Sequence, residues 1–206
     1  MNVGTPNLQI MIHFYTCTAH RFKTVTMYPE HEQARILDEI VRSNAWYGGR
    51  FAVGHREEYM KKRLFVEARM YEDFAAKYAA PTNRHPVYFY LRPCLDLDGI
   101  ERGLQQRRKY GESGTKYLLL DLDDIAHKSQ ISFTLFDSHR SYAAAFARAT
   151  SGHLELTPSL PDQGTVFHID EIADVYTRNR DVEGLSFEVQ IWDPSVLRDP
   201  CARRGL

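Results

Sequence analysis

The stretch from Leu185 to Trp192 reads LSFEVQIW, an apolar and aromatic run that carries a single carboxylate, Glu188. Residues of this kind favour a β-strand. Successive side chains of a strand point to opposite faces, so Glu188 and Gln190 share one face and the apolar residues between them share the other. An ordinary half-buried strand has this pattern, and so does a strand that holds a functional carboxylate in apolar surroundings. Glu188 is therefore the first candidate for a functional residue.

The composition limits what kind of protein this is. The chain has 206 residues, of which 43% are hydrophobic and 26% charged, values typical of a globular protein with one sizeable core. Its 26 basic and 27 acidic residues nearly cancel, which excludes the strongly basic type that coats nucleic acid non-specifically. The three cysteines, Cys17, Cys94 and Cys201, lack zinc-site spacing. We find no apolar run long enough to span a membrane and no pattern typical of a signal peptide. We therefore expect a cytoplasmic protein without membrane association.

Helices and strands are mixed along the chain. The sequence predicts strands at 8–16, 87–91, 117–122, 131–136 and 185–192, and helices at 29–43, 56–78, 142–149 and 169–178. The strand at 117–122 is apolar throughout, which predicts burial on both faces. Strict alternation of strand and helix is absent, so we expect a single α+β domain.

The long helix at 56–78 has an apolar pattern of its own. Apolar and aromatic residues recur there at alternating steps of four and three, which predicts a stripe that faces the core. This stripe consists of Leu64, Ala68, Tyr71, Ala75 and Tyr78.

Several familiar chemistries lack support in the sequence. The chain has no GxGxxG, GxxxxGK[ST] or GxSxG motif. The acidic group Asp121, Asp123 and Asp124 could bind Mg²⁺ or form a solvated end of a strand. Asp170 with Glu188 and Gln190 faintly resembles a metal-dependent nuclease site, but without the lysine of such sites. We expect no bound metal.

Four segments stand in an informative order: HFYT at 13–16, PVYFYLRP at 86–93, FTLFDSH at 133–139 and FEVQI at 187–191. In this order they resemble motifs of the DarT-like branch of the ADP-ribosyltransferase superfamily. The first resembles an HxT strand, with one extra residue between His and Thr, and the second an aromatic VPFYF strand. The third is similar to FTDGH, with an insertion and Ser138 in place of Gly. The fourth is similar to the AEVLV strand that carries the catalytic Glu.

The resemblance implies a fold and an activity. The fold would be ADP-ribosyltransferase-like over residues 1–206, with mixed or antiparallel central sheets that form an NAD cleft flanked by helices. The activity would be transfer of ADP-ribose from NAD, as co-substrate, to a base of RNA or single-stranded DNA. Such enzymes often act as toxins or phage-defence effectors, and an antitoxin or chaperone holds them in check. A protein side chain as acceptor, or a catalytically inactive binding module, remains an alternative.

The resemblance also implies roles for single residues. Glu188 would stabilise positive charge on the ribose during bond cleavage. The strand with His13, Tyr15 and Thr16 would contact NAD, with His13 hydrogen-bonded to a ribose. Either of two tyrosines, Tyr88 or Tyr90, would stack on the nicotinamide ring.

Basic residues complete the predicted site. Arg63 is the candidate to bind the diphosphate, although Arg56 or Arg50 would serve as well. The alternative is an ordinary surface arginine. His139 is a catalytic base near the acceptor, a nucleotide contact at a helix N-terminus, or a residue of a capped turn. The basic stretch 102–109 could guide a nucleic-acid strand.

Overall fold

The structure, a computed structural model, describes residues 8–15, 22–43, 54–93, 101–102, 105, 116–125, 127–151 and 160–197. Six strands form one sheet in the order β3-β1-β2-β6-β4-β5, and each neighbouring pair is antiparallel. The strands are β1 (Ile10–Tyr15), β2 (Val87–Leu91), β3 (Lys116–Asp121), β4 (Ile131–Leu135), β5 (Phe167–His168) and β6 (Phe187–Ile191). The predicted α+β class is thereby confirmed.

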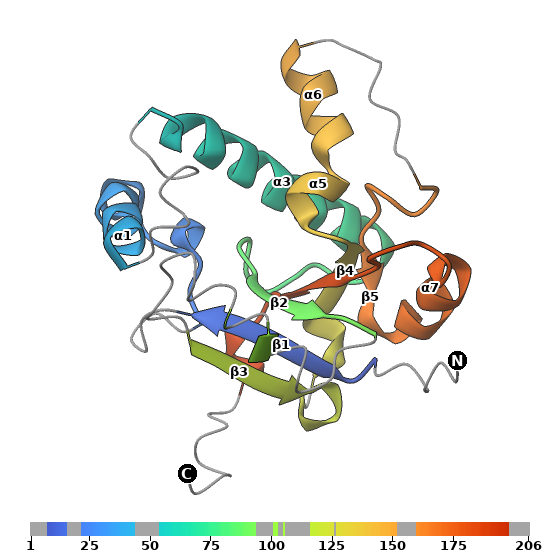
Figure 1. Cartoon of the computed structure of the whole chain (residues 1–206). Coiled ribbons are helices and arrows are strands. Elements are labelled where there is room, and N and C mark those ends of the chain that lie inside the picture. Colours follow the sequence, from blue (N-terminus) through green and yellow to red (C-terminus); the bar gives the residue numbers. More distant parts are fainter. Residues whose placement is uncertain are drawn as a thin grey trace, which may run out of the picture.

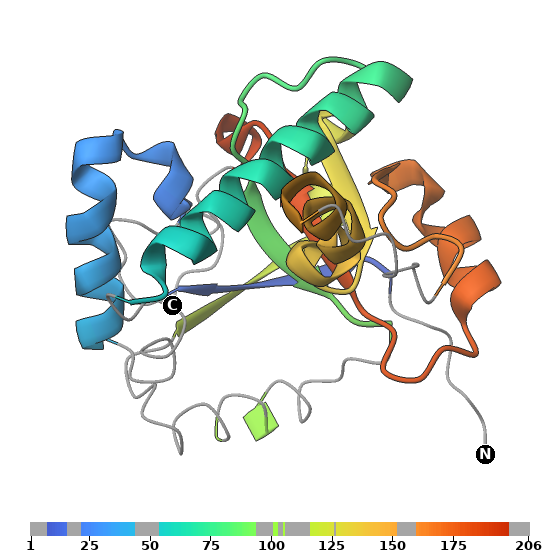
Figure 2. The same cartoon turned by 90° about the horizontal axis from the view of Figure 1, so that it is seen from above.

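Helices flank the sheet (Figures 1 and 2). They are α1 (Glu30–Ser43), α3 (Arg56–Lys77), α5 (Ser138–Ser141), α6 (Ala143–Ser151) and α7 (Ile172–Asn179). The long helix α3 crosses one face of the sheet and contacts α5 and α6. Pro29 precedes α1, and its fixed φ suits the start of a helix. Among the described residues, no helix is both long and apolar enough to cross a membrane.

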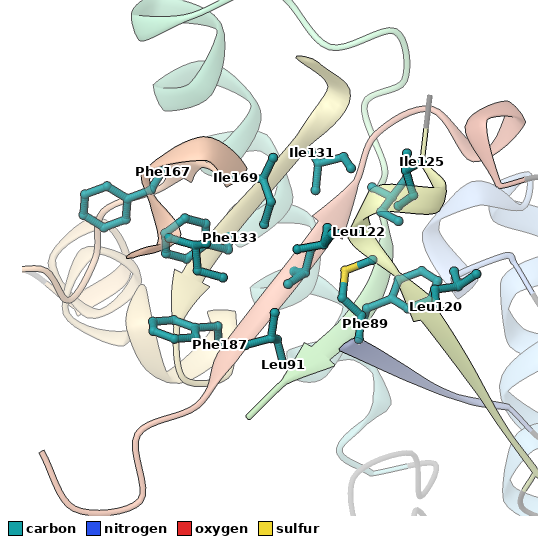
Figure 3. Close-up of a cluster of buried hydrophobic side chains, with 14 of the residues drawn as sticks. Phe89, Leu91, Leu120, Leu122, Ile125, Ile131, Phe133, Phe167, Ile169 and Phe187 are labelled. Carbon is teal, nitrogen blue, oxygen red and sulfur yellow. The ribbon is translucent and has the colours of Figure 1, made fainter. Parts of the chain in front are cut away.

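The main hydrophobic core lies on the sheet face opposite α3. It is built from every second residue of the strands, including Phe89, Phe133, Phe187 and Val189, all fully buried. Figure 3 shows these aromatic side chains stacked against aliphatic ones from neighbouring strands. Helix α7 adds Ile172 and Val175 to the cluster. Burial of each such side chain contributes about 1.5 to 3 kcal/mol, so this core supplies much of the stability of the sheet.

The buried stripe of α3 differs from the predicted one. Leu64 and Tyr78 are exposed, at 42% and 38%, whereas Glu67, Met70 and Phe74 are fully buried. The true stripe runs from Arg63 through these three residues, again at steps of four, three and four, and is rotated by one position. The apolar pattern missed this stripe by one position because Arg63 and Glu67, which belong to it, are charged. Tyr71 of the predicted stripe still packs against the buried cluster.

The strand at 117–122 is not buried on both faces as predicted. It forms β3, which among the described strands pairs with β1 alone. Lys116 and Tyr117 are exposed and Leu120 is buried. An apolar edge strand and an apolar central strand have the same sequence pattern, so the sequence alone does not separate them.

Some predictions fall on residues outside the described part of the chain. These are Thr16, Arg50, the three cysteines, and the basic stretch 102–109 except for Arg102 and Gln105.

Candidate functional site

Glu188 lies in the middle of β6, near the centre of the sheet. Its cross-strand neighbours are Tyr90 on β2 and Thr134 on β4, and its side chain is 1% exposed. Gln190 shares its face, as predicted, and bonds Ser132 Oγ, Thr134 Oγ1 and the Glu188 carbonyl at 3.0, 3.3 and 2.8 Å. This buried polar layer faces α3. Glu188 is thus neither solvated nor packed into the apolar core.

A turn after β4 supplies the hydrogen bond that fixes Glu188. The Ser138 backbone N–H donates to Glu188 Oε1 at 3.2 Å. Phe136 has φ of 57°, in the left-handed region that non-glycine residues rarely adopt, and its N–H bonds the Ser186 carbonyl at 2.7 Å. Asp137 then caps α5 by accepting the N–H groups of the second and third residues after it. This cap directs a backbone donor at the carboxylate.

The surroundings of Glu188 raise the pKa of its carboxyl toward neutral pH. Burial raises its pKa from 4.5 to about 7, and the nearby charge of Asp137 adds to this rise. Arg63 and hydrogen bonding to Ser138 oppose it. The Ser138 hydroxyl is fully buried and has no hydrogen-bond partner among the described residues. A carboxyl with this pKa can stabilise positive charge and can also exchange a proton near neutral pH.

Arg63 enters the same side of the sheet from α3. Its Nε donates to Glu67 Oε1 at 2.7 Å, and its Cζ lies 3.8 Å from the centroid of the Tyr88 ring. Glu67 also accepts from Tyr88 Oη at 3.0 Å and from His85 Nδ1 at 2.6 Å. Burial disfavours the charge of Arg63, but the surrounding tyrosines and carboxylates, including Glu188, raise its pKa well above the usual value for arginine. Arg63 is therefore a fixed positive charge beside the candidate carboxylate.

His139 lies next to Arg63. Nη1 of Arg63 is 3.4 Å from His139 Nε2, and the Tyr59 ring centroid is 5.3 Å from that of the imidazole. Burial and the charge of Arg63 lower the pKa of His139 to about 4, against the opposing charge of Asp137. Since an arginine only donates, Nε2 accepts and the proton sits on Nδ1. A group with this pKa is a weak proton acceptor at neutral pH, which favours a contact role over that of a general base.

His13 and Tyr15 lie on the other face of the sheet. Ile12 pairs with Tyr90 and so shares the face of Glu188, which leaves the flanking His13 on the opposite face. His13 Nδ1 is 2.7 Å from the Tyr88 carbonyl oxygen, and its ring is 4.8 Å from that of Phe89. Tyr15 stacks on His13 at 6.1 Å. The structure therefore does not bring these two residues to Glu188.

The acidic groups considered as metal ligands have other roles. Asp121 caps the short 3₁₀-helix Leu122–Asp124 by accepting the Asp123 N–H, and Asp123 bonds Lys128 Nζ at 3.0 Å. The Asp170 side chain is 71% exposed, unlike that of Glu188. No cluster of three or more His, Cys, Asp or Glu residues within the described ranges is arranged to hold a metal ion.

The sequence reasoning missed Glu67 and its partner His85. The one signal for Glu67 was its position four residues after Arg63, a spacing that places opposite charges side by side on a helix. Nothing in the sequence connected His85, in the turn before β2, with that pair.

The structure gathers five of the predicted residues on the α3 side of the sheet: Glu188, Arg63, Tyr88, Tyr90 and His139. Comparison of the chain with protein-family models, with curated proteins and with solved structures gave no match.

Proposed function

We propose that the protein is an NAD-dependent ADP-ribosyltransferase that transfers ADP-ribose to a base of RNA or single-stranded DNA, on an ADP-ribosyltransferase-like fold. The observation that carries the proposal is the buried Glu188 carboxylate. It is fixed by the Ser138 N–H, has a pKa near 7, and lies beside the permanent charge of Arg63. The order of the four sequence segments supplies the expectation that this site binds NAD.

NAD supplies a ribose bonded to a cationic nicotinamide, which leaves with the bonding electron pair. Glu188, when ionised, stabilises the positive charge that develops on the ribose as this bond breaks. The acceptor nitrogen forms the new bond and loses a proton. A carboxyl with a pKa of about 7 can take this proton and return it to water at neutral pH.

The surrounding residues suit the remaining parts of a dinucleotide. Arg63 carries the charge that would bind the diphosphate. The Tyr88 ring already packs on the Arg63 guanidinium, so Tyr90, the cross-strand neighbour of Glu188, is the better candidate to stack on nicotinamide. His139, neutral and next to Arg63, would contact the nucleotide. His13 and Tyr15 have no role in this site.

Labelled NAD tests the proposal directly. Wild type and Glu188→Gln are incubated with NAD labelled in its adenylate part, together with single-stranded DNA, duplex DNA, RNA or a protein lysate. We expect wild type to label a single-stranded nucleic acid and to release one nicotinamide per label. Labelling of protein alone would move the acceptor to a side chain. Equal nicotinamide release by both proteins, with nothing labelled, would overturn the proposal.

The pH dependence of nicotinamide release gives a second prediction. The ionised form of Glu188 is the active one, and its raised pKa keeps the carboxyl protonated well above pH 4.5. The rate at saturating NAD should therefore rise with pH, with an apparent pKa of about 7, and level off by about pH 8. Initial rates from pH 5 to 9 measure this. A profile that is flat between pH 6 and 8 would contradict the role of Glu188.

Asp137→Asn separates the charge of Asp137 from its capping role. Asparagine caps a helix about as well as aspartate, so α5 should persist. Loss of the negative charge removes one of the causes that raise the pKa of Glu188. We expect the rise of the rate with pH to move to lower pH while the plateau rate changes little. An unmoved profile would show that Asp137 does not act on Glu188.

A catalytically inactive binding module of the same fold is the second candidate. The position of His13 on the far face favours it, because the resemblance implies that His13 binds a ribose of NAD. Calorimetric titration separates the candidates. An active enzyme should give saturable heat with NAD, and an inactive module with a closed site should give none.

A further inference from the structure

Glu67 is a second buried carboxylate on the α3 side of the sheet, and its side chain is fully buried. Its two oxygens accept three hydrogen bonds from Arg63 Nε, Tyr88 Oη and His85 Nδ1. Burial opposes its charge, but Arg63 and His85 lower its pKa below 4.5, so Glu67 is ionised at neutral pH. A buried charge persists only where its partners are fixed, so all four side chains are held in one arrangement.

The arrangement restrains Arg63 most of all. Glu67 holds Nε, the Tyr88 ring covers the guanidinium, and Nη1 faces His139. Its side chain is only 12% exposed. Within the described part of the chain, no residue bonds Nη2. Arginine normally loses much rotamer freedom when it binds a ligand, and here that loss has already occurred on folding.

Stability alone does not explain this pair. The attraction between two buried charges is little larger than the free energy lost when both are removed from water. A well-packed apolar pair of similar volume would therefore stabilise the fold equally well. A carboxylate with three donors does what an apolar pair cannot, which is to fix the direction of a guanidinium.

We infer that Glu67 is a positioning residue, which holds Arg63 ready to bind the diphosphate of NAD. The inference rests on the proposed function, and it adds a residue that does not itself contact NAD. Glu67→Gln keeps the size of the side chain and one acceptor oxygen but removes the charge that holds Arg63 Nε. Loss of one well-placed charged hydrogen bond to the ligand corresponds to about a tenfold change in affinity.

The experiment compares wild type, Glu67→Gln, Arg63→Ala and the double variant, by NAD calorimetry and by the kinetics of nicotinamide release. Asp73→Asn is the matched control, because Asp73 forms an i,i+4 pair with Arg69 on the same helix at 3.1 Å, and asparagine keeps an oxygen that can accept the hydrogen bond from Tyr142 Oη. We expect Glu67→Gln to raise Kd and KM for NAD about tenfold with a smaller change in kcat. Asp73→Asn should alter neither constant, and Glu67→Gln should add nothing to Arg63→Ala.

A purely structural role for Glu67 gives a different result. Partial unfolding lowers the active fraction and thus the apparent kcat, but leaves KM unchanged. Either of two results would overturn the inference. One is an unchanged KM in Glu67→Gln, and the other is an equal increase in KM when Glu67→Gln is added to wild type and to Arg63→Ala. Tyr88→Phe is the milder variant if Glu67→Gln folds poorly. It removes one donor to Glu67 Oε1 and keeps the ring, so KM should rise about two- to threefold, and no rise would also count against the inference.

A measurement without NAD separates this inference from the proposed function. In a proton–nitrogen NMR spectrum, the Arg63 Nε–H should give a slowly exchanging signal, assigned by its loss in Arg63→Ala. The signal should be lost or exchange fast in Glu67→Gln and persist in Asp73→Asn. If wild type neither binds nor cleaves NAD, the proposed function fails, and the signal still shows whether Glu67 holds Arg63. Persistence of the signal in Glu67→Gln would show that Glu67 does not.

Discussion

Glu188→Gln should slow nicotinamide release from NAD about 100- to 1,000-fold at pH 8, with little change in KM. Glutamine has the size of glutamate and can still accept the Ser138 N–H, but it has no negative charge to stabilise the cationic ribose. The loss therefore falls on the step in which that charge develops. Single-turnover kinetics at saturating NAD measure it. A rate within threefold of wild type would show that another group carries the chemistry.

The stability of the same variant supplies the control. The folded-state pKa of Glu188 is raised to about 7, so its contribution to stability is complete below pH 4.5 and is lost as pH rises through 7. The free energy of unfolding of wild type should fall by about 3 kcal/mol relative to Glu188→Gln between pH 4 and pH 8. Urea unfolding at both pH values tests this. The inactive variant should thus be relatively more stable at pH 8, which separates lost chemistry from lost structure.

Glu67→Leu should destabilise the fold by about 3 to 5 kcal/mol, because it leaves the Arg63 guanidinium buried without a counter-charge. His85 Nδ1 and Tyr88 Oη also lose the acceptor of their hydrogen bonds to Glu67. Urea unfolding at pH 7 gives the value. By contrast, Asp73→Asn removes one charge of the partly exposed pair with Arg69 and keeps an acceptor for Tyr142 Oη, so it should cost about 1 kcal/mol or less.

The double variant Arg63→Met with Glu67→Leu tests why Glu67→Leu destabilises the fold. If the cost comes from an unpaired charge, removal of both charges should restore most of the lost stability while NAD binding stays weak. A double variant as unstable as Glu67→Leu would show instead that the cavity and the lost hydrogen bonds dominate.

The sequence predicted the strand of Glu188 and the order of the main elements, because these depend on local patterns. Alternation along 185–192 correctly placed Glu188 and Gln190 on one face of the strand. The same local rules gave no information on what covers a strand, so 117–122 was expected to be buried on both faces, whereas the first residues of β3 are exposed.

The site was predicted less completely, since it depends on pairings across the sheet. His13 and Glu188 belong to different strands, and only the register between β1 and β2 shows that they lie on opposite faces. Glu67 was missed because a charged residue in a helix is normally solvated. Its burial depends on His85 and Tyr88, which come from a turn and a strand beyond the helix.

The position of β6 has a consequence for synthesis on the ribosome. This strand follows the other five in the chain, yet in the sheet it lies between β2 and β4. A nascent chain that has not reached residue 187 therefore has β3-β1-β2 and β4-β5 as two separate groups, with a gap where Glu188 belongs. Pairings this distant in sequence form late in folding. Glu188 can therefore lie between its cross-strand neighbours Tyr90 and Thr134 only after residues 187–191 have been synthesised, and a fragment released before that point lacks both the carboxylate and the strand that joins the two groups.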